Sequence, residues 1–387
     1  MNSIATDYQP SARLIRWLWG LVLGGGAALA LGLVISPQMA LSSLLASGYT
    51  LLCAGLAGIF FVAAQYASGA AWAVAFRRVP EAMCAALPVG ALIVGVTLLA
   101  GSELYPWVHD RHHITGFKAM WLDFPFFLGR AVFYLLLWWA FARKILATSR
   151  AQDANPDPAL SQRNTRLSVI FLVLFAITFW LASFDWIMSL EPHWYSTIFG
   201  IYNFAGMFSS GIAIIILLVL WMRRAGPLRD FVTDEHFHDL GKLLFGFSSF
   251  WMYIWFSQYM LIWYANITEE TVRYIHLQHR YWLPLFILNV ILNWVFPFLA
   301  LLNKRVKRTG HLLARVAVVV LVGRWLDVYL MVQPAMGGEN PSLAIWDIGA
   351  IVAASALFVL LFVRGMRQAP PVPAGDPRLA ESLHYHN

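Results

Sequence analysis

The sequence predicts an all-α polytopic membrane protein with ten transmembrane helices. Hydrophobic residues make up 60% of its 387 positions and charged residues only 12%, about half the charged fraction of an average soluble domain. The apolar residues gather in stretches of about 20, the length that a helix needs to cross the hydrocarbon core of a bilayer. The polar segments between these stretches are too short to fold as a separate soluble domain.

Each predicted span is an apolar run bounded by a polar or aromatic connection. Trp and Tyr residues concentrate near the ends of the runs, as expected for side chains at a membrane–water interface. Gly24–Gly26, Gly55 and Gly58 mark helix faces that can pack closely. The predicted spans are Leu14–Ile35, Leu44–Ala64, Ala82–Gly101, Phe124–Ala147, Leu167–Ser189, Ser196–Met222, Leu240–Tyr264, Tyr281–Leu302, Leu312–Val332 and Leu343–Val363.

The distribution of basic residues predicts the topology. With ten spans, both termini lie on the same side of the membrane. Cytoplasmic connections carry an excess of Lys and Arg, so the more basic side is the cytoplasmic one. Both termini are therefore predicted to be cytoplasmic, because the 27 Lys and Arg residues all fall on the side of the termini except Arg111, Lys118, Arg130, Arg273, Arg280 and Arg324.

The chain is predicted to form one membrane domain with two tails. Residues 1–13 form a cytoplasmic tail, residues 14–364 the transmembrane domain and residues 365–387 a second cytoplasmic tail. The second tail contains several prolines, among them Pro370, Pro371 and Pro373, and little apolar sequence, so it is predicted to be disordered. Within the domain, the order of the spans suggests two four-helix bundles, made of spans two to five and six to nine, with two peripheral helices.

Composition and motifs exclude several function classes. The net charge of +7 lies in short connections, where membrane topology explains it, so no nucleic-acid partner is expected. Cys53 and Cys84 lie in apolar stretches without a CxxC motif, which argues against iron–sulfur clusters and covalent haem. None of the 11 histidines lies inside a span, where the axial ligands of a haem b would be. The sequence shows neither a cluster of metal ligands nor a Walker or Rossmann motif.

Candidate functional residues lie at the outer end of span five and in the connection that follows it. Asp185, Glu191 and His193 are close in sequence and titrate over different pH ranges. An ionised carboxylate in a membrane protein usually faces a partner or a water-filled cavity. Such groups could accept the protons that a quinol releases when it is oxidised. The alternative is structural, with Asp185 acting as a cap on the connecting turn.

A second candidate is the pair Arg324 and Asp327 on span nine. Their spacing of three residues places both on one helix face. Arg324 lies roughly 18 Å into the span, so its guanidinium needs a carboxylate from Asp327 or from another helix. The functional interpretation is a proton relay or a contact with a quinone headgroup. The alternative is an ion pair that only holds helices together.

Further candidates lie on three other spans. Asp123 and Arg130 are seven residues apart and are predicted to share one face of span four. Asn289 and Asn293 on span eight, and Gln258 on span seven, could hold water molecules between buried acids. Buried amides of this kind more often form hydrogen bonds between helices.

Three segments of the chain resemble a known family. The segments are Ser183–Gly200, Trp255–Glu270 and Gly323–Pro334, and they occur in this order along the chain. Each resembles a segment of the ActF membrane subunits of bacterial alternative complex III, and the similarity extends from about span two to span ten. The fold that this resemblance implies is that of NrfD-like and polysulfide-reductase-like subunits, with ten helices and two four-helix bundles.

The resemblance also implies a function and partners. Alternative complex III is a respiratory quinol:cytochrome c oxidoreductase of the bacterial inner membrane, and this type of subunit is often described as quinone-binding. The implied partners are the lipid bilayer, a paralogous ActC-like membrane subunit, iron–sulfur and multihaem cytochrome c subunits, and a terminal oxidase in some complexes. The implied ligand is menaquinone or ubiquinone, with no redox cofactor held by this chain itself.

The matching positions carry this role to individual residues. The resemblance implies that Asp185, Glu191, His193, Arg324 and Asp327 contribute to a quinone pocket or a proton pathway. Two alternatives of other classes remain. One is a scaffold subunit without chemistry. The other is a secondary transporter, for which Gly24–Gly26 would be one of two matching helix breaks.

Overall fold

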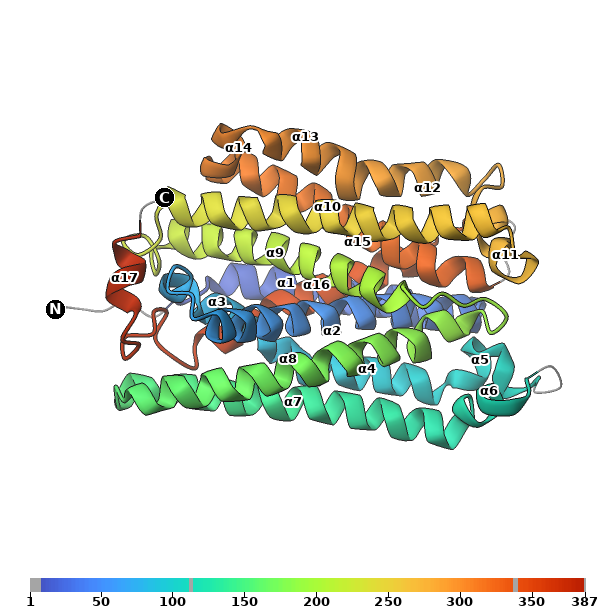
Figure 1. The fold of residues 1–387 in the computed structure, drawn as a ribbon, viewed down its shortest axis with the longest axis horizontal. Coiled ribbons are helices and arrows are strands. Elements are labelled where there is room, and N and C mark those ends of the chain that lie inside the picture. The colour runs from blue at the N-terminus through green and yellow to red at the C-terminus, as the bar shows by residue number, and fades with distance from the viewer. Residues whose placement is uncertain (1–7, 111–113, 337–339, 386–387) are drawn as a thin grey trace.

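The computed structural model describes residues 8–110, 114–336 and 340–385. Within these residues every regular element is a helix, and the long helices run side by side along the longest axis of the molecule (Figure 1). The α-helices are α1 (Ala12–Ile35), α2 (Pro37–Ser68), α3 (Arg78–Met83), α4 (Leu87–Leu99), α5 (Gly101–Leu104), α6 (Gly116–Trp121), α7 (Phe124–Ala154), α8 (Pro158–Trp186), α9 (Phe199–Ala225), α10 (Asp234–Ala265), α11 (Thr268–Leu277), α12 (Leu283–Val290), α13 (Phe296–Leu302), α14 (Lys304–Arg308), α15 (Gly310–Val332), α16 (Ile345–Met366) and α17 (Leu379–Leu383).

Nine helical stretches in the described residues are long and apolar enough to cross a membrane. They coincide with nine of the ten predicted spans, so the prediction of a multi-pass helical membrane protein is confirmed at this level. The remaining predicted span, Leu240–Tyr264, lies within α10, which has 32 residues. This helix is long enough, but it is rich in Trp and Tyr, whose side chains are only partly apolar.

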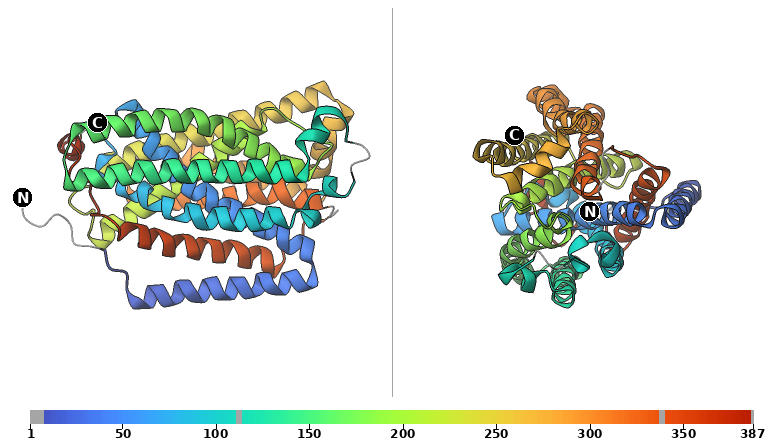
Figure 2. Two further views of the ribbon diagram at one scale, coloured as in Figure 1. Left: turned by 90° about the horizontal axis from the view of Figure 1, so that it is seen from below. Right: turned by 90° about the vertical axis from the view of Figure 1, so that its right-hand side faces the viewer.

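The long helices pack as two groups of four with two helices outside them. In the first group α2, α4, α7 and α8 contact one another in a closed ring, and in the second α9, α10, α15 and the stretch from α12 to α13 do the same. Helices α1 and α16 pack against each other, and α16 also packs on α2, so this pair lies at one side of the bundle (Figure 2). The arrangement agrees with the grouping that the order of the spans suggested.

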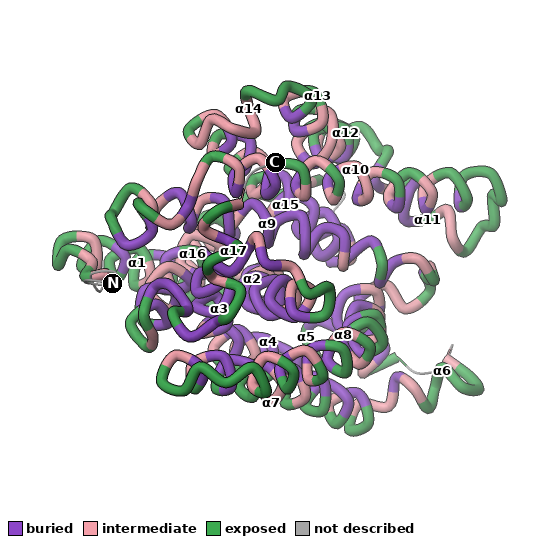
Figure 3. The backbone as a smooth tube through the Cα atoms, turned by 60° about the vertical axis from the view of Figure 1, so that its left-hand side comes forward, coloured by how far each residue is buried: buried purple, intermediate pink, exposed green. Residues whose placement is uncertain are grey.

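Three helices form the buried centre of the molecule. The apolar windows of α2, α9 and α15 are 83%, 78% and 72% buried, whereas that of α1 is 17% buried. Figure 3 shows the same contrast, with the buried backbone concentrated where α2, α9 and α15 meet. Polar side chains on these three helices are therefore shielded from lipid, which is where an ionisable group in a membrane can be kept.

Glycines allow the close contacts between helices that the sequence predicted. A Cβ atom at Gly25 would collide with the backbone of Gly349 on α16, and one at Gly55 would lie 2.9 Å from the Leu87 side chain. Helix α1 continues without a break through Gly24–Gly26. Gly25 and Gly55 therefore serve helix packing, whereas no atom lies within 4 Å of an added Cβ at Gly24 or Gly26. The helix break that a transporter fold would require at this position is not formed.

The stretch from α12 to α13 contains one turn of π-helix at Ile291–Val295. Pro297 has no backbone N–H, so it cannot donate to the carbonyl of Asn293 four residues earlier. The Ser248 hydroxyl of α10 donates to that carbonyl instead. The π turn thus places Asn289 and Asn293 in the interior, a use that such turns often have at functional sites.

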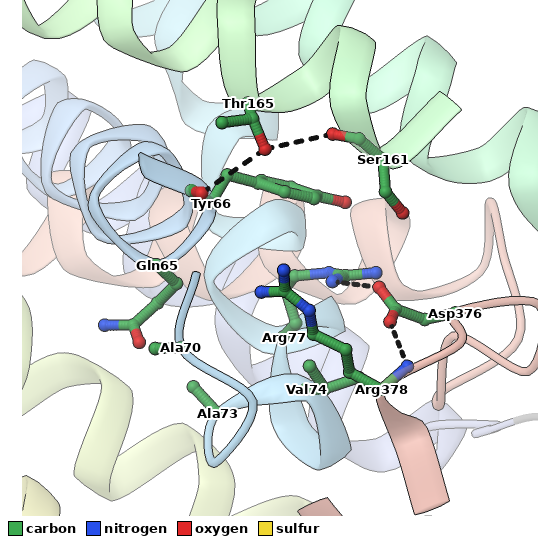
Figure 4. A pocket seen from close by; sticks show the side chains of 10 residues that line it. All are labelled: Gln65, Tyr66, Ala70, Ala73, Val74, Arg77, Ser161, Thr165, Asp376 and Arg378. Atoms are coloured by element: carbon green, nitrogen blue, oxygen red, sulfur yellow. Dashed lines mark hydrogen bonds and ion pairs between the residues drawn. The ribbon is translucent and has the colours of Figure 1, made fainter. Parts of the chain in front are cut away.

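The C-terminal tail differs from the predicted disorder. Asp376 pairs with the buried Arg77 at 2.6 Å, and the hydroxyl of Ser382 in α17 donates to the Trp72 carbonyl at 2.8 Å. Figure 4 shows Asp376 between Arg77 and the backbone of Arg378, beside a cavity of about 20 Å³. The sequence analysis judged the tail by its prolines and overlooked that a buried arginine needs a carboxylate. Residues 1–7 of the N-terminal tail lie outside the described residues.

Candidate functional site

Two of the buried carboxylates at the end of the bundle away from the chain termini accept hydrogen bonds from an arginine, a tyrosine and a tryptophan. Asp185 lies in the last turn of α8, in the first group of helices, and is 1% exposed. Asp327 is on α15 in the second group and is 0% exposed. A buried carboxylate needs charge compensation and hydrogen bonds to stay ionised. The two sites are described in turn as the Asp185 cluster and the Asp327 cluster.

The Asp185 cluster holds its carboxylate with three side chains. Arg130 on α7 donates through Nε at 3.0 Å and through Nη2 at 2.9 Å, which is a bidentate contact. The indole of Trp121 donates at 2.8 Å and the hydroxyl of Tyr134 at 3.3 Å. The Arg130 guanidinium also lies 4.0 Å from the Trp121 ring centre. Two oxygens therefore receive four donated hydrogen bonds.

From their spacing, Asp123 and Arg130 were predicted to share one face of span four, and the structure does not place them so. The structure places Asp123 at the N-cap of α7, where its carboxylate accepts from the backbone N–H of Phe126 at 3.4 Å. Its backbone is extended and lies outside the helix, so the rule for residues on one helix face does not apply to it. Arg130 pairs with Asp185 on a different helix, a contact that no spacing rule could reveal.

A pocket of about 430 Å³ opens beside the Asp185 cluster. Its wall is mostly apolar and aromatic, and its polar side chains include Lys118, Ser189 and Glu191. Trp121 separates the pocket from Asp185, because its ring lines the pocket while its N–H donates to the carboxylate. Concave apolar sites with a few oriented polar groups are typical of ligand pockets. We call this site the outer pocket; it is lined by Phe117, Lys118, Trp121, Leu122, Leu181, Phe184, Met188, Ser189, Glu191, Pro192, Trp194 and Tyr195.

The Asp327 cluster is more enclosed than the Asp185 cluster. Arg324 Nη1 lies 2.6 Å from Asp327 Oδ2, so the predicted pairing of these two residues is confirmed. Asn289 donates to Oδ1 at 3.0 Å and the Trp251 indole to Oδ2 at 3.3 Å. The hydroxyl of Tyr202 on α9 also donates a hydrogen bond to Oδ1. Four helices thus converge on one carboxylate.

A second layer of amides surrounds this cluster. Asn293 donates to the side-chain oxygen of Asn289 at 2.7 Å, which orients Asn289 toward Asp327. Arg324 donates through Nη2 to Asn203 at 3.3 Å, and Tyr49 on α2 donates to the same oxygen at 3.2 Å. Of the amides that the sequence singled out, Asn289 therefore contacts the buried acid directly, Asn293 orients Asn289, and Gln258 bonds to Tyr274 on α11.

Gly206 on α9 makes room for the Arg324 side chain. A Cβ atom at this position would clash with Arg324 Nη1 and lie 2.9 Å from its Cζ. The guanidinium is therefore packed directly on the backbone of α9. This close contact excludes lipid and explains how a cation can lie on a mostly apolar helix.

A small cavity adjoins Asp327. Its volume is about 30 Å³, room for about two water molecules. Gln258, Asn289 and Tyr274 line it together with Asp327, and Gln258 donates to the Tyr274 hydroxyl at 2.9 Å. Burial raises the pKa of Tyr274 in α11 to about 12, so its phenol keeps its proton at neutral pH. The cavity thus offers donors and acceptors next to a carboxylate.

Glu191 and Arg273 connect the two regions. Arg273 on α11 pairs with the Glu191 carboxylate, lies 4.8 Å from the Trp194 ring centre and donates to the Leu330 carbonyl at 3.1 Å. Arg273 also lines the small cavity, whereas Glu191 lines the outer pocket. The Glu191 side chain is 23% exposed, so it can exchange protons with its surroundings. His193 is exposed on the same connection and belongs to neither cluster.

Sequence reasoning missed several members of the site. It named Arg273 only among the basic residues of the outer side, and it did not name Trp121, Tyr202 or Trp251. Trp251 lies seven residues before Gln258, so helical periodicity could have placed both on one face of α10. For Trp121 and Tyr202 no such signal exists, because they approach the carboxylates from other elements.

Comparison with known proteins assigns no family to the chain. Neither the comparison with protein-family models nor the comparison with curated proteins found a match. Among the described residues, no three His, Cys, Asp or Glu side chains converge as metal ligands would. Inference about function therefore depends on the two clusters, the outer pocket and the three motifs.

Proposed function

We propose that this chain is a membrane subunit of a respiratory quinol:cytochrome c oxidoreductase, or of one with another electron acceptor, in a bacterial inner membrane. Its role is to bind the quinone headgroup in the outer pocket and to receive protons at Glu191. The motif resemblance to ActF subunits supports this proposal, because the first motif includes Asp185 and Glu191 and the third includes Arg324 and Asp327. The implied partners are a paralogous ActC-like subunit, iron–sulfur and multihaem cytochrome c subunits, and a terminal oxidase.

We also propose that α10 is a tenth span and that both termini are cytoplasmic. Helix α10 runs the length of the bundle between α9 and α12, and both described ends of the chain lie at one end of the molecule (Figure 1). An even number of spans fits termini at one end. The excess of Lys and Arg at that end is the charge pattern of a cytoplasmic face.

One observation supports the proposed function most strongly. A pocket with an apolar aromatic wall, of a size suited to a headgroup, contains a partly exposed carboxylate, Glu191. That carboxylate is linked through Arg273 to a small polar cavity next to Asp327. A purely structural connection would not require an ion pair whose carboxylate lines a ligand-sized pocket and whose guanidinium lines an internal polar cavity.

The chemistry assigned to these residues follows from their environments. A quinol that loses two electrons must also lose two protons, and a carboxylate near its hydroxyl can act as the base. Glu191 fits this role because it is accessible, whereas Asp185 is held by the Arg130 guanidinium. Asp185 instead fixes the Trp121 ring that forms the pocket wall. The electrons pass to a redox centre in a partner subunit, since the proposal gives this chain no redox cofactor.

The test is the activity of the complex purified with its native partners. Glu191→Gln keeps a hydrogen-bonding group beside Arg273 but cannot accept a proton. We expect quinol oxidation to fall by about 100-fold or more, the usual contribution of a general base, with assembly unchanged. The control is Glu103→Gln, an exposed carboxylate at the same end of the molecule. Equal activity of both variants and the wild type would refute the assignment.

The scaffold function is a second candidate, and the Asp327 cluster favours it. Both oxygens of Asp327 are fully hydrogen-bonded within the protein, as a purely structural ion pair would be. Asp327→Asn separates the two functions. A scaffold predicts loss of assembly with normal turnover in whatever complex remains. A proton pathway predicts normal assembly with impaired proton release.

A further inference from the structure

A large groove lies at the cytoplasmic end of the proposed topology, far from the two carboxylates. Its volume is about 740 Å³, and it runs between α7 and the end of α16, above the junction of η2 (Cys84–Ala86) and α4. One part of its wall is apolar and includes Leu87 and Val89 of α4 and Leu146 of α7. Three arginines, Arg143, Arg150 and Arg364, line the same groove.

The three guanidiniums carry uncompensated charge. No ion pair joins any of them to a carboxylate among the described residues. Arg143 lies 5.3 Å from the Trp139 ring centre, and Arg150 donates through Nη1 to the neutral Gln368 at 2.8 Å. The Nε of Arg150 is buried and has no hydrogen-bond acceptor within the described structure. A buried N–H without an acceptor is costly, and an anion held by the terminal amino groups of the same guanidinium would offset part of that cost.

The depth of the arginines matches the level of lipid phosphates. Helices α7 and α16 both start at the outer end, at Phe124 and Ile345. About 20 helical residues cross the hydrocarbon core. Counted from those starts, Arg143 and Arg364 are each the twentieth residue, which places both at the inner boundary of the core. Arg150 follows Arg143 by two helical turns on the same face.

We propose that this groove binds one anionic phospholipid, with its phosphodiester between Arg143, Arg150 and Arg364 and its acyl chains along the apolar part. Basic pockets between helices on the cytoplasmic side are suited to such headgroups. A zwitterionic phospholipid also has a phosphate, but its ammonium group would be repelled by three neighbouring cations. A neutral quinone has no charge to match them. The occupant is therefore a lipid with net negative charge.

The test is native mass spectrometry of the full-length protein in detergent, with phosphatidylglycerol or phosphatidylcholine added at equal concentration. We expect retention of phosphatidylglycerol in preference to phosphatidylcholine, and a decrease of this preference as salt is raised. Each Arg→Gln substitution at positions 143 and 364 is expected to weaken binding about fivefold, and the pair about 30-fold. Arg→Lys at both positions keeps the charge and should restore most of the affinity.

The control variant is Arg224→Gln, which removes an exposed arginine from α9 at the same end but outside the groove. It should bind phosphatidylglycerol as the wild type does. Equal binding of the two lipids by the wild type would overturn the proposal without any variant, and so would an equal loss in Arg224→Gln and in the double variant. Undiminished phosphatidylglycerol binding by the double variant would overturn it as well.

Discussion

The Asp185 and Asp327 clusters share one local arrangement of residues. Each carboxylate lies near the end of the fourth long helix of its group, and each accepts from an arginine, a tyrosine and a tryptophan. In both cases a proline follows seven residues after the aspartate, as Pro192 and Pro334. A short 3-10 turn follows each helix, η4 (Met188–Leu190) and η6 (Gln333–Met336).

The two clusters differ in the residue before that proline. In the first group it is Glu191, which lines the outer pocket and pairs with Arg273. In the second group it is Gln333, whose amide donates to the buried Asp347 at 3.0 Å. An ionisable group faces a pocket in one case, and an amide closes a buried contact in the other. Under the proposed function, this difference assigns the exchange of ligand and protons to the first cluster and internal stabilisation to the second.

The largest expected effect is on the enclosed cluster. Arg324→Leu leaves Asp327 buried without its cation, and loss of one partner of a buried ion pair costs about 3–5 kcal/mol. Thermal unfolding in detergent should show a large decrease in the midpoint. Arg130→Leu in the Asp185 cluster should lower the free energy of unfolding by less. Arg130 is 9% exposed, and the outer pocket lies beside the Asp185 cluster. A larger decrease in the unfolding midpoint for Arg130→Leu than for Arg324→Leu would contradict this expectation.

A smaller effect is expected from Gly206→Ala. The added methyl group would displace the Arg324 guanidinium, and overpacking of this kind costs about 1–3 kcal/mol. The same unfolding experiment measures it. Gly26→Ala is the control, since no atom lies within 4 Å of the position where its Cβ would be, and it should leave stability unchanged or slightly higher. Equal stability of the Gly206→Ala protein and the wild type would show that Arg324 is not tightly packed.

Trp121→Phe tests the open cluster. The substitution keeps the aromatic wall of the outer pocket but removes the N–H that donates to Asp185, and a hydrogen bond to a charged group contributes about 1.5–3 kcal/mol. We expect lower stability and weaker binding of a quinone analogue, measured by titration of the purified protein. The control Trp263→Phe changes a ring on α10 that is 66% exposed and does not line the outer pocket. If Trp121→Phe binds the analogue as the wild type does, the hydrogen bond from Trp121 to Asp185 does not support ligand binding in the outer pocket.

The smallest effect is expected at the π turn. Ser248→Ala removes the hydroxyl that donates to the Asn293 carbonyl, at a cost of about 1 kcal/mol. The neighbouring Ser249→Ala is a matched control, because the Ser249 hydroxyl has no hydrogen-bond partner within the described residues. A difference between the two variants in unfolding midpoint would measure how much this contact supports the Asp327 cluster. Identical midpoints would show that it supports nothing.

The sequence predicted the fold better than the site, for a physical reason. Hydrophobic length gives each span directly, and most helix ends lie within four residues of the predicted ones. At one end of α2, α7, α8 and α10, however, the helix extends six to nine residues beyond the predicted span. The pair Arg324 and Asp327 was predictable because both lie on one helix. The pairing of Arg130 with Asp185 depends on how α7 packs on α8, and no local spacing encodes it. The order of the C-terminal tail likewise depends on a distant charge, Arg77.

The proposed function requires a quinone headgroup to bind in the outer pocket beside Glu191. Photolabelling of the assembled complex with an azido-quinone, followed by peptide mapping, tests this binding most directly. We expect label in Gly116–Leu122 or Phe184–Tyr195, and we expect excess quinone to remove it. Label confined to other segments, or label here that excess quinone does not reduce, would contradict it.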